Sequence, residues 1–166
     1  MQQFNFKNGI LNLKVKRSPL LVRVTMFFFA FFFFSFPVLG VLLDIMTGSR
    51  LQFGYFVAIG ILALLGFYLL RVSLWNTYGE ENIEILYNKI IYEANYGWFK
   101  DGKKEFDILA PNYSFKTVGY EEDYTGVLVI SSEKPQFESV VKMPLAQLEE
   151  LIFILKRYYF INDEIS

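Results

Sequence analysis

Two long, almost uncharged runs near the start of the chain constrain its fold more than any other feature. The first, residues 20–43, contains Arg23 as its only charged side chain, and the second, residues 53–70, contains none. At ~1.5 Å per residue, a helix of about 20 residues crosses a hydrocarbon core of ~30 Å. The sequence therefore predicts two transmembrane helices, at 20–43 and 53–72, joined by a short connection at 44–52 into a hairpin that spans residues 20–74.

Charge is distributed unequally around the predicted hairpin. Residues 1–23 carry five basic and no acidic side chains, whereas residues 76–166 carry nine basic and sixteen acidic ones, a net charge of −7. Because basic flanks stay in the cytoplasm, the N-terminus should be cytoplasmic, and two crossings return the C-terminus there. We expect a multi-pass protein of the cell inner (cytoplasmic) membrane. An acidic domain also disfavours nucleic acid as a partner.

After Gly79 the apolar residues alternate with polar ones, a period typical of β-strands. Turn residues divide the pattern into six predicted strands: 82–87, 90–96, 104–108, 113–119, 125–131 and 137–143. Short turns favour an antiparallel meander. Pro144 then fits the first turn of a helix that reaches about Phe160. Residues 75–166 thus form a predicted α+β soluble domain next to the membrane α-helical hairpin.

Further residues suggest a family. A two-helix hairpin, then Trp75, Gly79, Glu81 and Ile83, then a strand meander and one C-terminal helix resemble bacterial membrane proteins with a pleckstrin-homology-like (PH-like) domain. The resemblance implies a bent antiparallel β-barrel or meander capped by the C-terminal helix, and implies binding or scaffolding instead of catalysis. Phosphoinositide-binding members carry clustered Lys and Arg around the first hairpin. Here that turn is Asn88-Lys89 with acidic neighbours, so headgroup recognition does not carry over.

The basic N-terminal arm, residues 1–19, contains its own strand signal. Apolar residues alternate on both sides of Asn8-Gly9, a dipeptide typical of two-residue hairpin turns. The arm is therefore a candidate β-hairpin. It either adds to the edge of the domain's sheet or stays a basic tail at the lipid surface, and the sequence leaves both alternatives open.

One predicted loop combines aromatic and basic side chains. It contains the candidate interaction residues Trp98, Phe99, Lys100, Lys103 and Lys104. Such a loop could dock a partner or enter the headgroup layer. The alternative is that Trp98 covers the open end of its own barrel. Three adjacent carboxylates at 121–123 are instead typical of a solvated turn.

The predicted membrane helices carry their own candidate residues. Phe28 and Phe32 belong to a run of eight phenylalanines, and Gly54 and Ala58 have the small-xxx-small spacing of helix contacts. These four residues are candidates for docking inside the membrane, although contact with lipid is the simpler explanation of the phenylalanines. Aromatic and basic side chains near the ends of the helices are candidate interface anchors: Arg23, Tyr68, Arg71 and Trp75.

The chain contains no Cys and no His, which removes thiolate and imidazole chemistry and the usual ligands of zinc, copper and haem. No catalytic motif is present, so we name no catalytic, cofactor-binding or metal-binding residue and expect no enzyme and no cofactor. The predicted function is a non-enzymatic accessory or scaffold subunit that docks on a larger membrane protein complex. A membrane-surface lipid or small-ligand sensor is the alternative. Expected partners are membrane lipids and another membrane protein, and a homo-oligomer stays open.

Overall fold

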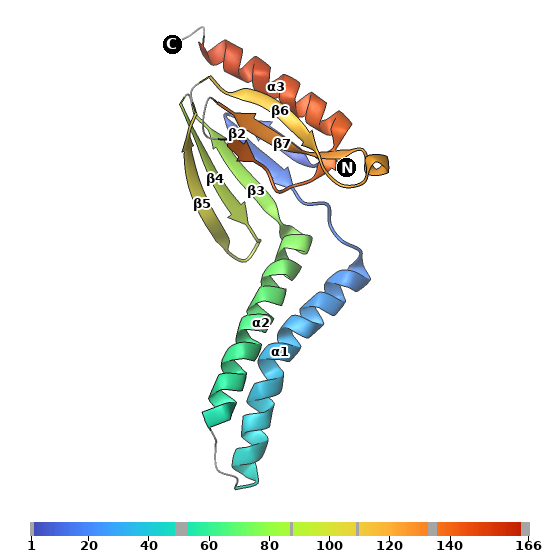
Figure 1. Cartoon of the computed structure of the whole chain (residues 1–166), viewed down its shortest axis with the longest axis vertical. Coiled ribbons are helices and arrows are strands. Elements are labelled where there is room, and N and C mark those ends of the chain that lie inside the picture. Colours follow the sequence, from blue (N-terminus) through green and yellow to red (C-terminus); the bar gives the residue numbers. More distant parts are fainter. Residues whose placement is uncertain (1, 49–52, 87, 109, 133–135, 164–166) are drawn as a thin grey trace. The chain divides into compact units, whose positions relative to one another are not determined.

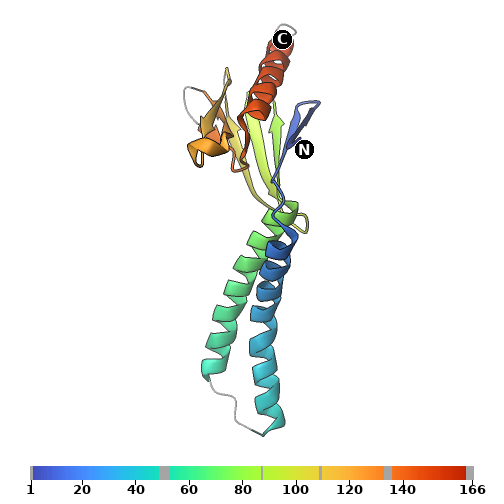
Figure 2. The same cartoon turned by 90° about the vertical axis from the view of Figure 1, so that its right-hand side faces the viewer.

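The computed structural model describes residues 2–48, 53–86, 88–108, 110–132 and 136–163 (Figures 1 and 2). The chain forms two compact units. The helical unit consists of residues 17–77, and the sheet unit combines residues 1–16 with residues 78–166. Part of the predicted connection between the apolar runs, residues 49–52, lies outside the described residues.

Two long helices make up the helical unit, α1 (Leu20–Met46) and α2 (Phe53–Tyr78). They run side by side in opposite directions (Figures 1 and 2). Both are long and apolar enough to cross a membrane, and few of their side chains are buried. A β-carbon added to Gly66 would lie 3.1 Å from the carbonyl oxygen of Ala30, so the backbones of the two helices approach closely at this point.

Helix α2 continues beyond the predicted apolar span. Polar side chains in its last turns hydrogen-bond to carbonyl oxygens four residues earlier: Ser73 Oγ to Leu69 at 2.6 Å, Asn76 Nδ2 to Val72 at 2.9 Å and Thr77 Oγ1 to Ser73 at 2.7 Å. These bonds satisfy the side chains locally, so polar residues need not end the helix. Trp75 therefore lies inside α2.

The described residues of the sheet unit form nine strands and a long helix. The five-stranded sheet is antiparallel and follows chain order: β1 (Phe4–Lys7), β2 (Ile10–Lys14), β3 (Glu80–Ile85), β4 (Lys89–Asn95) and β5 (Lys100–Asp107). The second sheet contains β6 (Asn112–Thr117), β7 (Thr125–Ser131), β8 (Gln136–Glu138) and β9 (Met143–Pro144), with β9 paired to β7. A short 3-10 turn, η1 (Glu121–Asp123), precedes β7, and helix α3 (Leu145–Asp163) follows β9.

The N-terminal arm supplies the first two strands of the larger sheet. Asn8 and Gly9 have φ values of 52° and 79°, the left-handed pair that a two-residue hairpin turn requires. Strand β2 then pairs with β3, with Leu11 opposite Ile83. The arm and the C-terminal part of the chain consequently fold as one unit, so they lie on the same side of any membrane that α1 and α2 cross.

Two predicted strand boundaries were wrong. The predicted strand 104–108 begins four residues earlier, at Lys100, because the turn is made at Gly97, where Tyr96 N donates to the Phe99 carbonyl at 2.9 Å. Gly97 has φ 85°, and a β-carbon there would lie 2.7 Å from that of Tyr78. The predicted strand 137–143 is interrupted after Glu138, because the amides of Val140 and Val141 bind the Glu81 carboxylate.

The predicted continuous meander was also wrong, and the predicted bent barrel is not confirmed. The described residues form two separate sheets and no closed barrel. Between β5 and β6 the chain passes Ala110, at φ 50°, and Pro111, which has no amide to donate to a ladder. Pro144 pairs within β9, and the helix begins one residue later. The coarse prediction of two apolar helices, antiparallel sheets and a C-terminal helix is confirmed.

The core of the sheet unit lies between the two sheets and α3. The apolar side of α3 contributes Leu148, Leu151 and Leu155, all fully buried. A β-carbon on Gly126 in β7 would lie 3.0 Å from the side chains of Leu145 and Leu148, so glycine allows α3 to approach this sheet. Phe137 contacts the rings of Tyr92 and Phe106 in the larger sheet, with centroids 5.4 and 5.6 Å apart.

Candidate functional site

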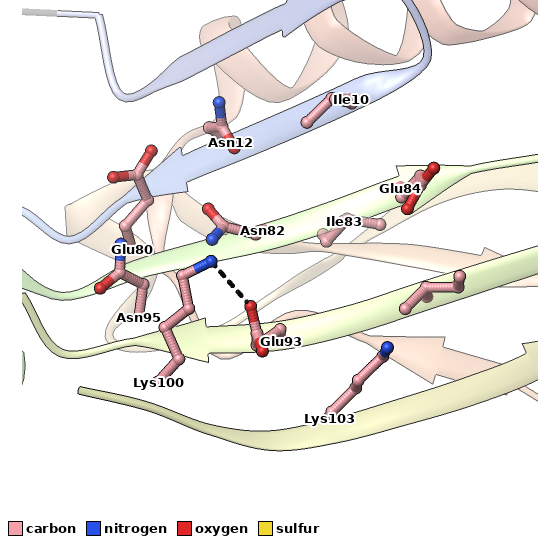
Figure 3. A pocket seen from close by; sticks show the side chains of 11 residues that line it. Ile10, Asn12, Glu80, Asn82, Ile83, Glu84, Glu93, Asn95, Lys100 and Lys103 are labelled. Atoms are coloured by element: carbon pink, nitrogen blue, oxygen red, sulfur yellow. Dashed lines mark ion pairs between the residues drawn. The ribbon is translucent and has the colours of Figure 1, made fainter.

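A polar hollow of about 480 Å³ lies on the outer face of the five-stranded sheet (Figure 3). Strands β2, β3, β4 and β5 contribute to it. Its lining combines amide, carboxylate and ammonium groups with three isoleucines: Ile10, Asn12, Glu80, Asn82, Ile83, Glu84, Ile91, Glu93, Asn95, Lys100 and Lys103. Hydrogen-bond donors and acceptors of both charges therefore converge on one surface.

Strand register brings these side chains together. Asn12 lies opposite Asn82, and Asn82 lies opposite Glu93, which makes one polar row across three strands. Successive residues of a strand point to opposite faces, so the buried neighbours Leu11 and Ile83 point into the core. Asparagine is depleted in β-strands, so the two amides of this row, Asn12 and Asn82 (the amide row), give no advantage for sheet formation itself.

The charges of the hollow are partly paired. Lys100 Nζ lies 3.0 Å from the carboxylate of Glu93 across β4 and β5 (Figure 3). Just outside the hollow, the Lys89 ammonium lowers the pKa of the Glu105 carboxyl through a hydrogen bond. Both pairs are solvent-accessible, so each contributes little to stability. Their effect is to hold side chains at defined places on an open face.

The structure separates the predicted interaction residues. Lys100 and Lys103 line the hollow, whereas Lys104 is paired with Tyr92 and belongs to the opposite face of β5. Trp98 is 62% exposed in the turn before β5. Phe99 stacks on Tyr96, with ring centroids 4.8 Å apart. The expected single aromatic and basic cluster is thus divided between a turn and two faces of one strand.

Sequence reasoning missed the buried carboxylate of Glu81. Its oxygens accept hydrogen bonds from Val140 N at 2.8 Å and Val141 N at 3.2 Å, and the Tyr92 hydroxyl also bonds to it. Burial raises the pKa of Glu81, and these hydrogen bonds oppose the rise. Burial likewise raises the pKa of Tyr92. A signal was present, because Glu81 occupies an inward position of the alternation that Ile83 and Ile85 continue.

The predicted docking residues of the helical unit are exposed, because no other described part of the chain packs over them. Phe28 and Phe32 are 63% and 42% exposed. Their rings stack with centroids 6.2 Å apart, and Phe32 stacks on Phe36 at 5.2 Å, which forms a ladder of three rings along α1. Gly54 has open space around it, and Ala58 is exposed.

A hairpin of α1 and α2 was predicted, but the residues at their close contact were not. The contact uses Ala30 and Gly66 instead of Gly54 and Ala58. Ala30 is the one small residue within the phenylalanine run 27–34, and this interruption was an available signal for a close backbone approach.

The predicted interface anchors all lie in α1 and α2. Tyr68 is exposed, whereas Arg23, Arg71 and Trp75 are half-buried. The Nε atom of Arg23 is buried and has no hydrogen-bond partner among the described residues.

These features define a chain with two candidate membrane spans and an α+β sheet unit that carries a polar open face. No group of three or more metal-ligating side chains occurs among the described residues. No protein-family model, curated protein or solved structure matches the chain. The chemistry of its surfaces is thus the basis for a functional proposal.

Proposed function

We propose that this protein is a non-enzymatic accessory or scaffold subunit that is anchored in the cytoplasmic membrane by α1 and α2 and docks on a larger membrane protein complex. The observation that carries the proposal is the uncovered ladder of Phe28, Phe32 and Phe36 on α1. Large aromatic surfaces left open by a chain are typical of contact with lipid or with another protein.

Membrane insertion is supported by the helices and by the arm. The apolar side chains of α1 and α2 are mostly uncovered, so a lipid environment removes a large apolar surface from water. The arm and the C-terminal part share one sheet, which requires an even number of crossings. The five basic residues of 1–23 support a cytoplasmic location for both ends, because the positive-inside rule associates basic flanks with that side.

The sheet unit also supports a finer proposal about its fold family. We assign it to the PH-like domains of bacterial membrane proteins, because antiparallel strands in two sheets lead into one C-terminal helix. Strands β1 and β2 are then an addition to that architecture. A domain of this kind presents loops and sheet edges to partners and needs no reactive group.

Protein contact explains the ladder better than lipid contact alone. Between helices in a membrane, the hydrophobic effect is weak and close packing drives association. Stacked rings hold each other in place, so they lose little side-chain freedom when a partner helix packs on them. Flexible aliphatic side chains would satisfy lipid tails equally well.

Site-specific photo-crosslinking in cells tests this proposal. A benzophenone amino acid at Phe28 or Phe32 should capture one specific membrane protein, which mild-detergent purification then recovers with the wild-type chain. The matched control is the same group at Phe34, whose ring contacts the site of Gly66 and should react with α2 of its own chain. Capture of lipid alone from Phe28 and Phe32, or of a second copy alone, would show that no larger complex binds the ladder.

The polar hollow favours a second candidate function, a lipid or small-ligand sensor at the membrane surface. Asn12, Asn82 and Glu93 offer donors and acceptors in one row, and Lys100 and Lys103 offer positive charge. In nanodiscs, the side-chain amide resonances of Asn12 and Asn82 should then shift when anionic lipid replaces neutral lipid. Lys100→Glu with Lys103→Glu should remove the shift, and unchanged resonances in both lipids would eliminate lipid sensing by this face.

A further inference from the structure

A second hollow, of about 350 Å³, lies at the loop between β6 and β7, away from the polar hollow described above. Tyr120 and Tyr124 line it together with Val118 and Leu145. These tyrosines are 85% and 72% exposed, more than the other large apolar side chains described in the sheet unit. Exposed tyrosines beside a hollow are common at the centres of protein interfaces.

Hydrogen bonds hold the backbone of the loop in place at both tyrosines. The backbone carbonyl oxygen of Tyr120 accepts a hydrogen bond from Asp123 N at 3.0 Å, and that of Tyr124 accepts one from Leu145 N at 2.9 Å. Two hydrogen bonds join the two ends of the loop. Val118 N donates to the carbonyl oxygen of Thr125 at 3.0 Å, and Thr125 Oγ1 donates to the carbonyl oxygen of Val118 at 2.8 Å. Tyr124 has φ 45°, which is rare for a bulky side chain. A loop fixed in this way loses little freedom when it binds.

The electrostatics of the loop select the kind of partner. Residues 121–123 are all acidic, and residues 117–133 contain no Lys or Arg. The nearest preceding base, Lys116, is paired with Glu138 at 3.2 Å. Such a surface repels phosphate groups and attracts cationic side chains.

We infer that the 117–125 loop is a docking surface for an arginine- or lysine-bearing segment of a partner membrane protein. Cytoplasmic loops of membrane proteins carry an excess of Lys and Arg, so a surface held on that side meets such segments. A guanidinium group can stack on a tyrosine ring while its N–H groups bond to carboxylates. The inference rests on the proposed accessory function, for which it supplies the cytoplasmic contact.

A binding experiment with a defined probe tests the surface directly. The full chain in neutral-detergent micelles is titrated into a fluorescent arginine-rich peptide, with the citrulline analogue as an uncharged control. The arginine peptide should bind and the citrulline peptide should not. Tyr120→Ala and Tyr124→Ala should each weaken binding about two- to fivefold, the value of one exposed cation–π contact. Glu122→Lys combined with Asp123→Lys should weaken it more than about tenfold, because attraction becomes repulsion.

Matched variants on α3 serve as controls. Phe153→Ala removes an equally exposed aromatic ring, and Glu149→Lys with Glu150→Lys makes the same charge change at exposed positions. Both should bind the peptide as the wild type does. Equal losses from the loop and the α3 variants would show general charge attraction and overturn the docking surface.

Crosslinking in cells separates failure of this surface from failure of the proposed function. A benzophenone group at Tyr120 should capture the same protein that Phe32 captures. If Phe32 captures a protein while Tyr120 captures lipid, a second copy or nothing, the accessory function stands and the docking surface is wrong. If Phe32 captures only lipid, the accessory function itself is wrong.

Discussion

Glu80 and Glu81 are adjacent and chemically identical, yet the sheet gives them opposite environments. Glu80 lines the polar hollow on the outer face of β3. Glu81 is fully buried on the inner face, where its carboxylate accepts two backbone hydrogen bonds. Alternation along a strand separates them completely, because one residue of displacement changes the face. The outer face can keep polar groups available to a ligand, whereas the inner face must satisfy every polar group it buries.

The next pair along the strand shows the same division. Asn82 belongs to the outer amide row, and Ile83 is fully buried between Leu11 of β2 and Tyr92 of β4. The two faces of β3 therefore have different environments: the inner face belongs to the core, and the outer face carries the polar groups of the proposed recognition surface. Substitutions at neighbouring positions can test this division directly.

The largest expected difference in the free energy of unfolding is between alanine variants at Ile83 and at Asn82. Ile83→Ala removes buried methyl groups and leaves a cavity, so the free energy of unfolding should fall by about 2–5 kcal/mol. Asn82→Ala should change it by less than about 0.5 kcal/mol, as is usual for accessible positions. Equilibrium unfolding of the full chain in neutral-detergent micelles, followed by circular dichroism, measures both. Similar losses for the two variants would contradict the division of faces.

The second-largest difference in stability should be between alanine variants at Glu81 and at Glu80. Glu81→Ala leaves the amides of Val140 and Val141 without their acceptor, at a cost of about 1–3 kcal/mol for each donor that stays buried. Glu80→Ala should stay within about 0.5 kcal/mol of the wild type. The same unfolding measurement compares them. If Glu80→Ala proved the more damaging, the carboxylate of Glu81 would not be the group that holds residues 139–141.

The pH dependence of stability should also reveal Glu81. Burial raises its pKa in the folded protein above the ordinary value of 4.5, so the folded state holds the proton more tightly than the unfolded state does. Its contribution to stability is then complete below pH 4.5 and is lost as pH rises through the folded pKa. The stability of the wild type relative to Glu81→Gln should accordingly decrease over that range. A relative stability that is independent of pH would refute the raised pKa.

The smallest expected effect is a gain. Asn82→Thr places a residue of high β-propensity on the outer face, so we expect a stabilisation of a few tenths of a kcal/mol. The variant should at the same time lose any lipid-dependent shift of the Asn12 amide. A clear destabilisation by Asn82→Thr would instead mean that the amide row serves folding and not recognition.

Several elements could be read from the sequence because their signals are local. The apolar runs predict α1 and α2 by length alone, and the Asn8-Gly9 turn needs only the φ values that these two residues readily adopt. Strand β7 has the predicted bounds, 125–131, because its centre, residues 127–130, is a run of aliphatic residues between clear turn signals. Local patterns of this strength leave few alternatives.

Other features depend on contacts between distant residues. The turn at Gly97 was missed because Asp101-Gly102 is an equally good turn sequence. Tyr78 lies so close to Gly97 that the position has no room for a side chain, and this contact cannot be seen in the local sequence. Strand β8 ends early because the amides of Val140 and Val141 donate to the carboxylate of Glu81, almost sixty residues earlier in the chain, and not to a neighbouring strand. The hollow was not predicted, since amides on three strands have no common sequence pattern; Lys100 and Lys103, which line it, were predicted as residues of a loop.

Periodicity and composition are sufficient to predict the two apolar helices, the alternating strands and the charge difference between the arm and the domain. Three features became apparent only in the folded chain: the arm joins the sheet, the meander divides into two sheets, and Glu80 and Glu81 have different environments. The physical reason is that register is a long-range property. Which residue of β2 or β4 lies opposite a given residue of β3 depends on how whole faces are buried, and no short segment of sequence contains that information.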